Sequence, residues 1–436
     1  MSLKITIIGS GYVGLTAGVG FAHFGHTVTC TDIDADKIAK LSAGICPIYE
    51  IGLEDLLKEN LQKNRLTFTT DTIQAVKDAD VVFFAVHTPE GEYGKANLSY
   101  LLNAAKTVSL ACKPDTLFIN KSTAPVGTIE KIREVIRQAR GDDNFLVATN
   151  PEFLKEGTAV EDFLKPDRIV VGCDDPRAEE RLRVLYRPLI EQDVPFVVTN
   201  IPTAELIKYA SNSMLALRIS FINEIADFCE LVGADVTAVA HAIGLDRRIG
   251  PHFLRAGIGY GGSCFGKDVK ALTLSGEEHG YEFKIIKALS TVNDLRYRIV
   301  IAKLTKHLRD LKGKAITVLG LAFKPMTDDV RDAPSLRIIH ELLDHGAKIT
   351  AYDPVANEMF QKKFPRSSDV VFASTTMEAT QKADALLLLT AWDEFQNLDL
   401  GEIKKTMSGS LIVDGMNILK RKDVEQAGFT YEGVGR

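Results

Sequence analysis

The stretch KITIIGSGYVG, residues 4–14, decides the fold of this chain. It opens with Lys4–Ile8, an apolar run typical of a buried strand. Gly9, Gly11 and Gly14 follow at once and lead into small residues with a helical pattern. The first glycine permits a tight turn, the second lets a pyrophosphate approach the backbone, and the third lets the helix pack on the strand. The stretch therefore predicts the start of a dinucleotide-binding βαβ unit.

An acidic residue stands where such a unit needs one. A second strand, Thr27–Thr31, ends at Asp32, about twenty residues after the glycines. We expect the Asp32 carboxylate to accept hydrogen bonds from the adenosine ribose and to repel a 2′-phosphate, which favours NAD over NADP. The glycines alone could form a merely structural turn, but the strand, helix and acid around them favour a cofactor site.

Strands and helices alternate on both sides of one long helical stretch. Helical spacing without Gly or Pro runs from Thr203 to about Leu231, and further helix is expected to about Leu311, broken by a glycine-rich loop at 257–266. The other expected strands are Val81–Val86, Leu117–Asn120, Phe145–Thr149 and Ile169–Gly172, and then Ala315–Leu319, Lys348–Tyr352, Leu386–Thr390 and Leu411–Asp414.

This order predicts an α/β fold with two Rossmann-like, doubly wound parallel-sheet domains, joined by a long central helix and a helical domain. The expected domains are 1–200 for NAD, 201–311 for the central helix and the cysteine loop, and 312–436 for the second Rossmann-like domain. The second domain has GLAFKP at 320–325 in place of the glycine fingerprint, so we expect it to bind something other than a dinucleotide.

Composition narrows the class of protein. The chain has 436 residues, is 45% hydrophobic and carries a formal net charge of −6, which disfavours a general nucleic-acid binder. No apolar run reaches the length of a membrane span, and glycines interrupt the N-terminal stretch too early for a signal peptide. The six cysteines are scattered without a CxxC pair, which predicts reduced thiols in a cytoplasmic protein and no metal site.

Cys264 is the cysteine with a candidate chemical role. It lies in a glycine-rich run, GIGYGGSCFGKD at 257–268, whose backbone amides can crowd a ligand or an oxyanion. Lys267 supplies a positive charge that could favour a thiolate, and Asp268 is a possible base or orienting group. The alternative is a small structural cysteine, which is the ordinary reading of the other five.

Three polar residues recur along the long helix. Glu205, Lys208 and Asn212 are spaced i, i+3 and i+7, so they share one face. Such a face is usually solvated. If it instead lines a ligand site, Lys208 could bind an anion or transfer a proton.

With these motifs in order, the sequence resembles the nucleotide-sugar dehydrogenases over nearly its whole length. The resemblance rests on IGSGYVG at 8–14, KSTAPVGT at 121–128, NPEFLKEG at 150–157, Glu205…Lys208…Asn212, RIG at 248–250, GGSC at 261–264, and FKP at 323–325 with DDVR at 328–331. Two positions depart from the family pattern: Gly266 stands where proline is usual, and His87 stands where a small or apolar residue is usual.

The resemblance implies roles for individual residues. It implies that Cys264 is the catalytic thiol, that Lys208 and Asp268 handle protons and the oxyanion, that Asn212 holds the reacting end, and that Thr123 and Glu152 position water, with Glu152 as base. It implies NAD contacts at Gly9, Gly11, Tyr12, Val13, Gly14, Asp32, Lys37, Thr88, Thr123, Glu156, Lys267 and Arg331. It implies sugar-nucleotide contacts at Glu152, Phe153, Leu154, Lys155, Lys208, Asn212, Arg248, Phe253, Gly257 and Lys324.

The implied reaction is the oxidation of the primary alcohol of UDP-glucose to a carboxylate with two NAD, through a thiohemiacetal and a thioester on Cys264. The family also implies a homodimer or higher homo-oligomer, with no nucleic acid or membrane as partner. Alternatives within the family are enzymes acting on GDP-mannose or an N-acetylated UDP-sugar. Outside it, a two-electron hydroxyacid dehydrogenase and a non-catalytic nucleotide-sugar sensor stay open.

Overall fold

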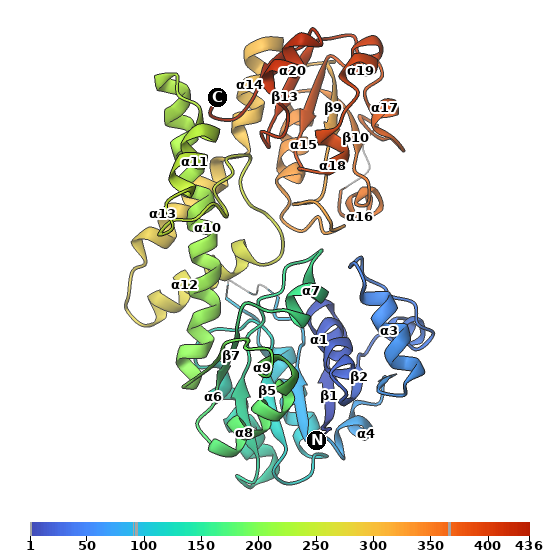
Figure 1. Cartoon of the computed structure of the whole chain (residues 1–436), viewed down its shortest axis with the longest axis vertical. Helices are drawn as coiled ribbons and strands as arrows, with labels where there is room; N and C mark the ends of the chain where they lie inside the picture. The colour runs from blue at the N-terminus through green and yellow to red at the C-terminus, as the bar shows by residue number, and fades with distance from the viewer. Residues whose placement is uncertain (1, 90, 92–94, 365–367) are drawn as a thin grey trace. The chain divides into compact units, whose positions relative to one another are not determined.

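The computed structural model of the chain describes residues 2–89, 91, 95–364 and 368–436. The chain forms two compact units, Met1–Ser211 with Lys270–Gly280 and Asn212–Val269 with Tyr281–Arg436. Each unit is built around a mainly or wholly parallel sheet with helices packed on it (Figure 1).

Within the described ranges, the first unit holds an eight-stranded sheet in the order β3-β2-β1-β4-β5-β6-β7-β8. Neighbouring strands are parallel, except that β6 and β7 meet antiparallel at Thr149 and Gly172. The strand order switches direction between β1 and β4, and ligands of open α/β sheets bind at the carboxyl ends of strands at such a point.

The strands of this sheet are β1 Lys4–Ile8, β2 Thr27–Thr31, β3 Leu66–Thr69, β4 Val81–Phe84, β5 Leu117–Asn120, β6 Leu146–Thr149, β7 Ile169–Gly172 and β8 Phe196–Thr199. Its helices are α1 Tyr12–His23, α2 Ala35–Ser42, α3 Leu53–Gln62, α4 Thr72–Val76, α5 Ser99–Ser109, α6 Thr128–Arg140, α7 Ala159–Leu164, α8 Pro176–Leu185 and α9 Arg187–Ile190.

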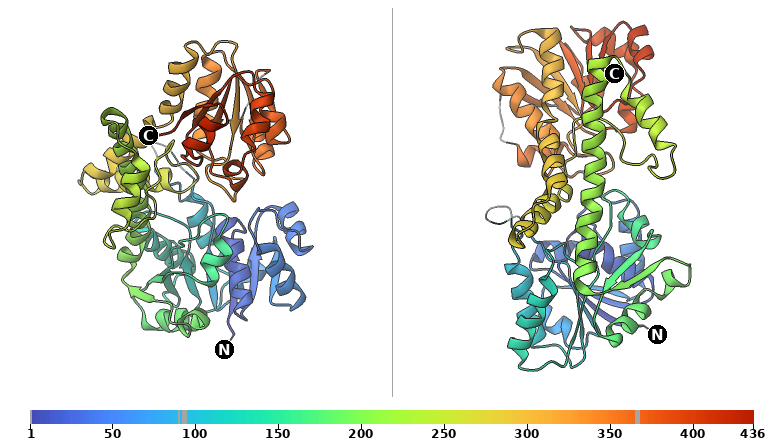
Figure 2. Two further views of the ribbon diagram at one scale, coloured as in Figure 1. Left: turned by 45° about the horizontal axis from the view of Figure 1, so that its top comes forward. Right: turned by 90° about the vertical axis from the view of Figure 1, so that its left-hand side faces the viewer.

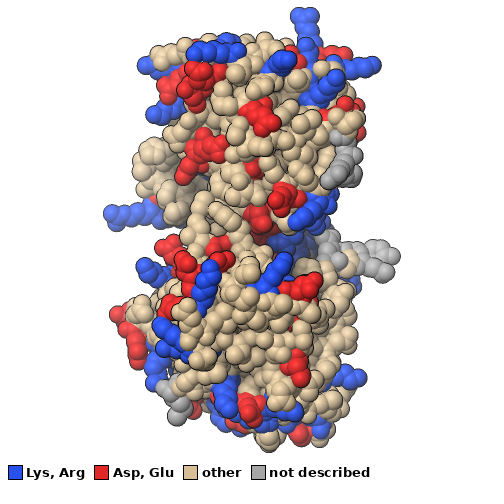
Figure 3. Space-filling view, turned by 90° about the vertical axis from the view of Figure 1, so that its right-hand side faces the viewer, with Lys and Arg blue, Asp and Glu red and all other residues tan. Residues whose placement is uncertain are grey.

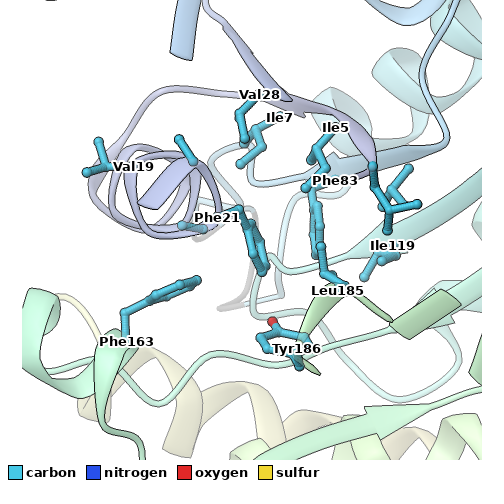
Figure 4. Close-up of a cluster of buried hydrophobic side chains, with 14 of the residues drawn as sticks. Ile5, Ile7, Val19, Phe21, Val28, Phe83, Ile119, Phe163, Leu185 and Tyr186 are labelled. Carbon is cyan, nitrogen blue, oxygen red and sulfur yellow. The ribbon is translucent and has the colours of Figure 1, made fainter. Parts of the chain in front are cut away.

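Alternation along the strands gives this sheet two buried faces. Ile7 of β1 and Phe83 of β4 pack with Phe21 of α1, whereas their chain neighbours Ile8 and Phe84 belong to the cluster on the opposite face. The ring centroids of Phe21 and Phe83 lie 5.2 Å apart in the cluster drawn in Figure 4. Continuous apolar strands such as VVFF are what a parallel sheet covered on both faces requires.

The second unit repeats the design. Its described residues form a six-stranded parallel sheet in the order β11-β10-β9-β12-β13-β14. The strands are β9 Ala315–Leu319, β10 Lys348–Tyr352, β11 Val370–Phe372, β12 Ala385–Leu388, β13 Leu411–Asp414 and β14 Thr430–Glu432. The helices that accompany them are α15 Pro334–Asp344, α16 Asn357–Lys363, α17 Thr376–Ala379, α18 Asp393–Gln396, α19 Leu400–Thr406 and α20 Arg421–Gln426.

Helices fill the sequence between the two sheets. The longest, α10, runs without interruption from Ile201 to Val232 and is the long green ribbon of Figure 1 and of the right-hand view in Figure 2. It is followed by α11 Val236–Gly244, α12 Phe265–Glu278, α13 Lys284–Leu295 and α14 Arg298–Leu308. In the second unit the end of the chain packs against α10, where Gly435 N donates to Glu230 Oε1 at 2.8 Å.

The predicted fold class is confirmed, and the long helix lies where its uninterrupted helical spacing predicted it. Four short strands were missed: β3, β8, β11 and β14, all at sheet edges, where partly exposed residues weaken the apolar signal. The predicted glycine-rich loop at 257–266 was too long, because α12 begins at Phe265 and includes Gly266. The three-domain boundaries stay a prediction.

The surface and the cysteines bear on the predicted class. On the face drawn in Figure 3, basic and acidic side chains are intermingled. No helix within the described ranges is long and apolar enough to cross a membrane. None of the six cysteines, all of which the structure describes, forms a disulfide.

Candidate active site

The glycine turn after β1 has the shape that a pyrophosphate needs. Gly9 has a φ of +97°, and a Cβ there would lie 2.6 Å from the carbonyl oxygen of Ala85. A Cβ on Gly14 would lie 1.9 Å from the carbonyl oxygen of Gly9, whereas one on Gly11 would meet nothing within 4 Å. The close backbone contacts therefore require glycine at positions 9 and 14. At Gly11 the absence of a side chain leaves open space at the start of α1. This turn fits a dinucleotide phosphate, which helix amides attract.

Asp32, at the end of β2, is held in place by its own segment. It accepts hydrogen bonds from Ser10 N at 3.0 Å and Lys37 Nζ at 2.8 Å. Burial opposes ionisation of Asp32, but these bonds and the amide of Asp34 hold its pKa below the ordinary value. The structure therefore brings the predicted NAD contacts Asp32 and Lys37 together as an ion pair.

Ile33 is a candidate binding residue that the sequence analysis missed. It follows Asp32 directly, and its side chain is 98% exposed, which is unusual for isoleucine. An apolar residue directly after the acid that ends the second strand was the available signal. Its exposure next to Asp32 makes it a candidate contact for the cofactor.

Replacing Asp32 with asparagine is expected to narrow the preference for NAD over NADP by about tenfold or more, because the carboxylate no longer repels the 2′-phosphate. The ratio of kcat/KM for the two cofactors measures this, with Asp36→Asn as a control that removes an exposed acid of α2. An unchanged ratio in the Asp32 variant would place this carboxylate away from the ribose.

Tyr12 and Glu50 join α1 to the NPEFLKEG segment. Glu50 is buried and accepts hydrogen bonds from the Tyr12 hydroxyl, from Gly157 N at 2.7 Å and from Ala159 N at 2.8 Å. Burial and the Glu50 carboxylate raise the pKa of Tyr12 above its ordinary value. Glu50 was missed, because it lies between helices with no motif around it. Val13, the next residue of α1, is half-buried in the same first turn.

The predicted catalytic residues Lys208 and Glu152 form a buried ion pair in the first unit. Lys208 Nζ of α10 lies 2.8 Å from Glu152 Oε1, and both side chains are at most 7% exposed. Glu152 Oε2 also accepts a hydrogen bond from Leu154 N at 2.6 Å. Burial alone would raise the pKa of Glu152, but Lys208, Leu154 N and Lys121 hold it below its ordinary value. These neighbours favour the carboxylate form of Glu152, which is the form that a general base needs.

Aromatic and basic residues surround this pair. The Lys208 ammonium lies over the Phe153 ring, 5.5 Å from the ring centroid. The guanidinium carbon of Arg168 also lies over this ring, 3.8 Å from the same centroid. Lys155 is exposed and pairs with Asp162 at 2.9 Å, while Glu156 is half-buried. The predicted sugar-nucleotide residues Phe153, Leu154 and Lys155 thus sit in one loop beside the ion pair.

Lys121 is a second buried lysine near Glu152, and the sequence analysis gave it no role. Its Nζ donates to Asn150 Oδ1 at 3.0 Å, and the Tyr186 hydroxyl donates to the same oxygen at 2.5 Å. Burial lowers the pKa of Lys121 to about 8, with Lys208 acting in the same direction and Glu152 opposing. The signal available in the sequence was a lysine directly after the strand Leu117–Asn120.

The other residues of the first unit that the sequence analysis named differ in their contacts and exposure. The Thr88 hydroxyl donates to the carbonyl of Thr123 at 2.9 Å, which links two predicted NAD contacts. His87, which departs from the family pattern, is exposed. Glu205 accepts hydrogen bonds from Gly127 N at 2.7 Å and Ile129 N at 3.0 Å, so its role is to cap α6.

The polar face of α10 is not solvated. Glu205, Lys208 and Asn212 are all buried, so the solvated-surface reading of their spacing was wrong. Glu205 and Lys208 belong to the first unit and Asn212 to the second. There, Asn212 Nδ2 donates to Asp268 Oδ2 at 2.6 Å, and Asp268 is 1% exposed.

Cys264 lies at the start of a helix. It is exposed, whereas the other cysteines are buried or half-buried. It directly precedes α12, and its carbonyl accepts the hydrogen bond of Asp268 N at 2.9 Å. The positive end of a helix dipole stabilises a thiolate at such a position. Lys267 and Asp268 belong to the first turn of α12, with Lys267 Nζ 3.8 Å from Asp268 Oδ1.

The departure at Gly266 is easily accommodated. Gly266 is the second residue of α12, where proline is also tolerated, and a Cβ there would meet nothing within 4 Å. Having glycine instead of proline at this position therefore removes no packing contact that would hold Lys267 in place.

Hydrogen bonds from three side chains fix the cysteine loop. Asn223 Oδ1 accepts from Gly257 N at 2.8 Å, and Arg296 Nε donates to Gly257 O at 2.8 Å. Asn293 Oδ1 accepts from Tyr260 N at 2.8 Å. These residues were missed, because they act from α10, from α13 and from the residue directly after α13 on a loop more than thirty residues away.

The far end of the loop is held by the segment after β9. Gly262 N donates to the carbonyl of Arg331 at 2.9 Å, and a Cβ on Gly262 would strike the Phe323 ring at 2.8 Å. The guanidinium of Arg331 pairs with Asp329 at 2.7 Å. Lys324 lies next to Phe323, with its ammonium 5.6 Å from that ring. The structure thus brings Arg331 and Lys324 to the loop that carries Cys264.

Arg248 and Phe253 lie in an exposed turn of the second unit. Arg248 pairs with Asp246 at 2.6 Å and its side chain is 88% exposed. Phe253 has a φ of +60° and its ring centroid lies 6.3 Å from that of Phe265. Arg218 of α10 holds this turn by donating to three carbonyls, those of His252, Ile249 and Gly250.

In the second unit, the acidic residue that corresponds in position to Asp32 is buried. Gly320 has a φ of +100° and occupies the place of Gly9 after the first strand. Asp353 follows β10 as Asp32 follows β2, but it is 1% exposed, and its oxygens accept from the backbone of Leu321 and Ala322 and from Trp392. A ligand of this unit must be recognised without this acid, which agrees with the expectation that it is not a dinucleotide.

Comparisons with known proteins place these features in a family. Residues 3–190, 202–295 and 317–421 match the models of the NAD binding, central and UDP binding domains of the UDP-glucose/GDP-mannose dehydrogenase family. The chain is 46% identical to a UDP-glucose 6-dehydrogenase of Rhizobium meliloti, with both chains covered completely, and 42% identical to one of Pseudomonas aeruginosa, covering 100% of this chain and 98% of that protein.

Solved structures agree. A UDP-glucose dehydrogenase from Pyrobaculum islandicum superposes with a TM-score of 0.93 at 39% identity, covering 100% of this chain and 98% of the other. A UDP-D-ManNAc dehydrogenase from Pyrococcus horikoshii superposes with a TM-score of 0.89 at 28% identity, covering 99% of each chain. The glycine turn and Asp32 fit NAD, in agreement with the match of residues 3–190 to the NAD binding domain of the family. The chain belongs to the UDP-glucose/GDP-mannose dehydrogenase family and is an NAD-dependent oxidoreductase.

Proposed function

We propose that the protein oxidises UDP-glucose to UDP-glucuronate in two steps through a covalent intermediate on Cys264. The observation that carries this proposal is the exposed Cys264 directly ahead of α12, on a loop held by hydrogen bonds from α10 and α13. The curated relatives named UDP-glucose 6-dehydrogenase, at 42% to 46% identity over the whole chain, support UDP-glucose as the substrate.

The overall balance is UDP-glucose, two NAD⁺ and water giving UDP-glucuronate, two NADH and three protons. NAD, held at the Gly9–Gly14 turn and Asp32, supplies the acceptor for the two electrons removed in each oxidation. The first oxidation converts the primary alcohol to an aldehyde. The Cys264 thiolate then forms a C–S bond to that carbon, and the oxygen takes up a proton to give a thiohemiacetal.

Oxidation of the thiohemiacetal removes its C–H hydrogen and its hydroxyl proton and leaves a thioester. Water then attacks the thioester carbon, the C–S bond breaks, and the thiolate of Cys264 returns. Capture as a thiohemiacetal explains why a dehydrogenase needs a cysteine: it retains the aldehyde and presents a tetrahedral carbon for the second oxidation.

The buried polar groups take the proton and charge roles. Glu152 is ionised and takes a proton from the attacking water, with Thr123 as a hydroxyl that helps to position that water. The Lys208 ammonium stabilises negative charge on the reacting oxygen. Asn212 and Asp268, joined at 2.6 Å, orient the reacting end of the sugar. We assign Phe153, Leu154, Lys155, Arg248, Phe253, Gly257 and Lys324 to the sugar nucleotide. We assign Glu156 to the nicotinamide side of NAD, and Lys267 and Arg331 to further NAD contacts.

The predicted homodimer or higher homo-oligomer stays a prediction. It is supported by exposed apolar residues at a spacing of seven along α10, Met214, Phe221 and Phe228, which are 54%, 48% and 61% exposed. Such a row lies along one side of a helix and is costly to leave in water.

The function is tested by counting NADH over a panel of UDP- and GDP-sugars. We expect UDP-glucose to give the highest kcat/KM and two NADH per molecule consumed, with UDP-glucuronate as the product. Preference for GDP-mannose or an N-acetylated UDP-sugar would reassign the substrate within the family. One NADH with free product aldehyde would favour a two-electron dehydrogenase, and binding without NADH formation would favour a sensor.

A further inference from the structure

Glu50 is a buried carboxylate that has no role in the proposed reaction. It is 8% exposed, and no Lys, Arg or His of the described ranges pairs with it. Its two oxygens instead accept hydrogen bonds from the Tyr12 hydroxyl and from the amides of Gly157 and Ala159. A buried carboxylate is costly unless such bonds satisfy it, and bonds to an ionised acceptor are about twice as strong as neutral ones. Glu50 therefore holds these donors more firmly than an uncharged side chain would.

The donors of Glu50 belong to two segments with different ligands in the proposed function. Tyr12 is the first residue of α1, next to the glycine turn that fits the NAD pyrophosphate. Gly157 and Ala159 follow the segment 152–156, whose residues we assign to the sugar nucleotide and to the nicotinamide side of NAD. The amide of Gly157 divides its hydrogen bond between Glu50 at 2.7 Å and the Tyr12 hydroxyl at 3.0 Å. The two segments are thus joined through one carboxylate.

Other contacts shape the segment 152–156 or hold α7 elsewhere on α1. Lys155 N donates to Asp162 Oδ2 at 2.9 Å, which ties the segment to α7. α7 packs on α1 through Phe163, whose ring centroid lies 5.1 Å from that of Phe21, near the end of α1. Glu50 adds the contact at the start of α1. Without it, the packing of Phe163 still holds α7 on the first unit, so a variant of Glu50 is expected to fold.

We propose that Glu50 is a positioning residue of the active site: it fixes the segment 152–156 to the first turn of α1, so that the sugar nucleotide meets a segment already placed beside the NAD site. This inference rests on the proposed function, which assigns that segment to the substrate. A segment ordered before binding does not draw on binding energy to become ordered. A misplacement of about 1 Å can lower a rate by about a hundredfold.

The anchor is tested with Glu50→Gln in the full-length, ligand-free protein. Glutamine has nearly the same shape, but its amide nitrogen cannot accept a hydrogen bond, so either Gly157 N or Ala159 N loses its acceptor. We expect hydrogen exchange at these amides, measured by mass spectrometry on peptides that span 155–160, to become about tenfold faster. Glu54→Gln, which removes an exposed acid of α3, should leave this exchange unchanged.

The role in the reaction is tested with the sugar nucleotide that gives the highest kcat/KM in the panel, which is UDP-glucose in our proposal. Glu50→Gln should lower this kcat/KM by about tenfold. Its Kd for NADH should change by less than about twofold, because the glycine turn is fixed by its own backbone contacts. Tyr12→Phe should also lower kcat/KM, but should add little to the loss in the double variant, since the two side chains act through one hydrogen bond.

Four results would overturn the inference. Wild-type exchange in Glu50→Gln would remove the anchor, and faster exchange with unchanged kcat/KM would remove its role in the reaction. Equal losses of kcat/KM and of NADH affinity would show a general structural effect. Additive losses in the double variant would show that Tyr12 and Glu50 act separately. If Glu50→Gln does not fold, Glu50→Asp, which keeps the charge but is too short to reach both segments, is judged by the same criteria.

Failure of this inference and failure of the proposed function are distinguishable. The exchange measurement needs no substrate, and the kinetic comparison uses whichever sugar nucleotide the wild-type enzyme prefers. A wild-type enzyme that prefers another sugar nucleotide, or that forms no adduct on Cys264, would overturn the proposed function. The anchor at Glu50 would in that case still be supported or overturned by its own exchange and kinetic results.

Discussion

Replacement of Cys264 by serine should lower the overall turnover of UDP-glucose by at least about a thousandfold, equivalent to about 4 kcal/mol of transition-state stabilisation. A serine hydroxyl has nearly the same shape, but its alkoxide is scarcely populated at neutral pH, while a thiolate is accessible. Thioester formation and release are both compromised. The first oxidation does not need the thiol, so NADH-dependent reduction of UDP-glucose aldehyde should survive far better.

Folding and NAD binding should survive this substitution. The loop is fixed by Asn223, Asn293 and Arg296 and by the contact of Gly262 with Phe323, none of which involves the sulfur. Thermal melting and NAD titration check this, and Cys173→Ser, at a half-buried cysteine of the first unit, is the matched control. Near-normal turnover in Cys264→Ser would refute covalent catalysis and would favour the alternative that the protein is a two-electron dehydrogenase.

The sequence predicted the features that depend on local pattern. The glycine turn was predictable because a Cβ on Gly9 or on Gly14 would clash with nearby backbone within the same βαβ unit. α10 was predictable because its helical spacing is long and uninterrupted. The role that we propose for Cys264 was suggested by its glycine-rich surroundings and by the family resemblance.

Other residues were not predictable, because their roles depend on contacts between distant segments. Glu50 caps a helix more than a hundred residues away, and Arg296, directly after α13, donates a hydrogen bond to Gly257. The burial of Lys121 depends on how β5 packs beside the Asn150 loop and on Tyr186, which no local pattern encodes. The start of α12 was misplaced because glycine is read as loop, although a helix tolerates Gly266 in its first turn.

The second large effect is expected from Glu152→Gln. Glutamine keeps the shape of the side chain and can still contact Lys208, but it cannot accept a proton from water at neutral pH. Breakdown of the thioester should slow by about a hundredfold or more, whereas its formation should slow much less. The protein should then accumulate with the sugar nucleotide attached to Cys264.

A matched control separates the chemistry from the loss of a buried charge. Glu205→Gln removes another buried carboxylate of the first unit, one that caps α6, and should produce no adduct. Loss of substrate affinity alone in Glu152→Gln, with no adduct, would make Glu152 a binding residue.

Intact-mass spectrometry of Glu152→Gln, mixed with UDP-glucose and NAD and quenched in acid, tests the central claim of covalent catalysis most directly. We predict a mass increase equal to one UDP-glucuronyl group, located on the peptide that contains Cys264 and absent from the double variant with Cys264→Ser. An unmodified Cys264 in a variant that still oxidises its substrate would contradict the claim.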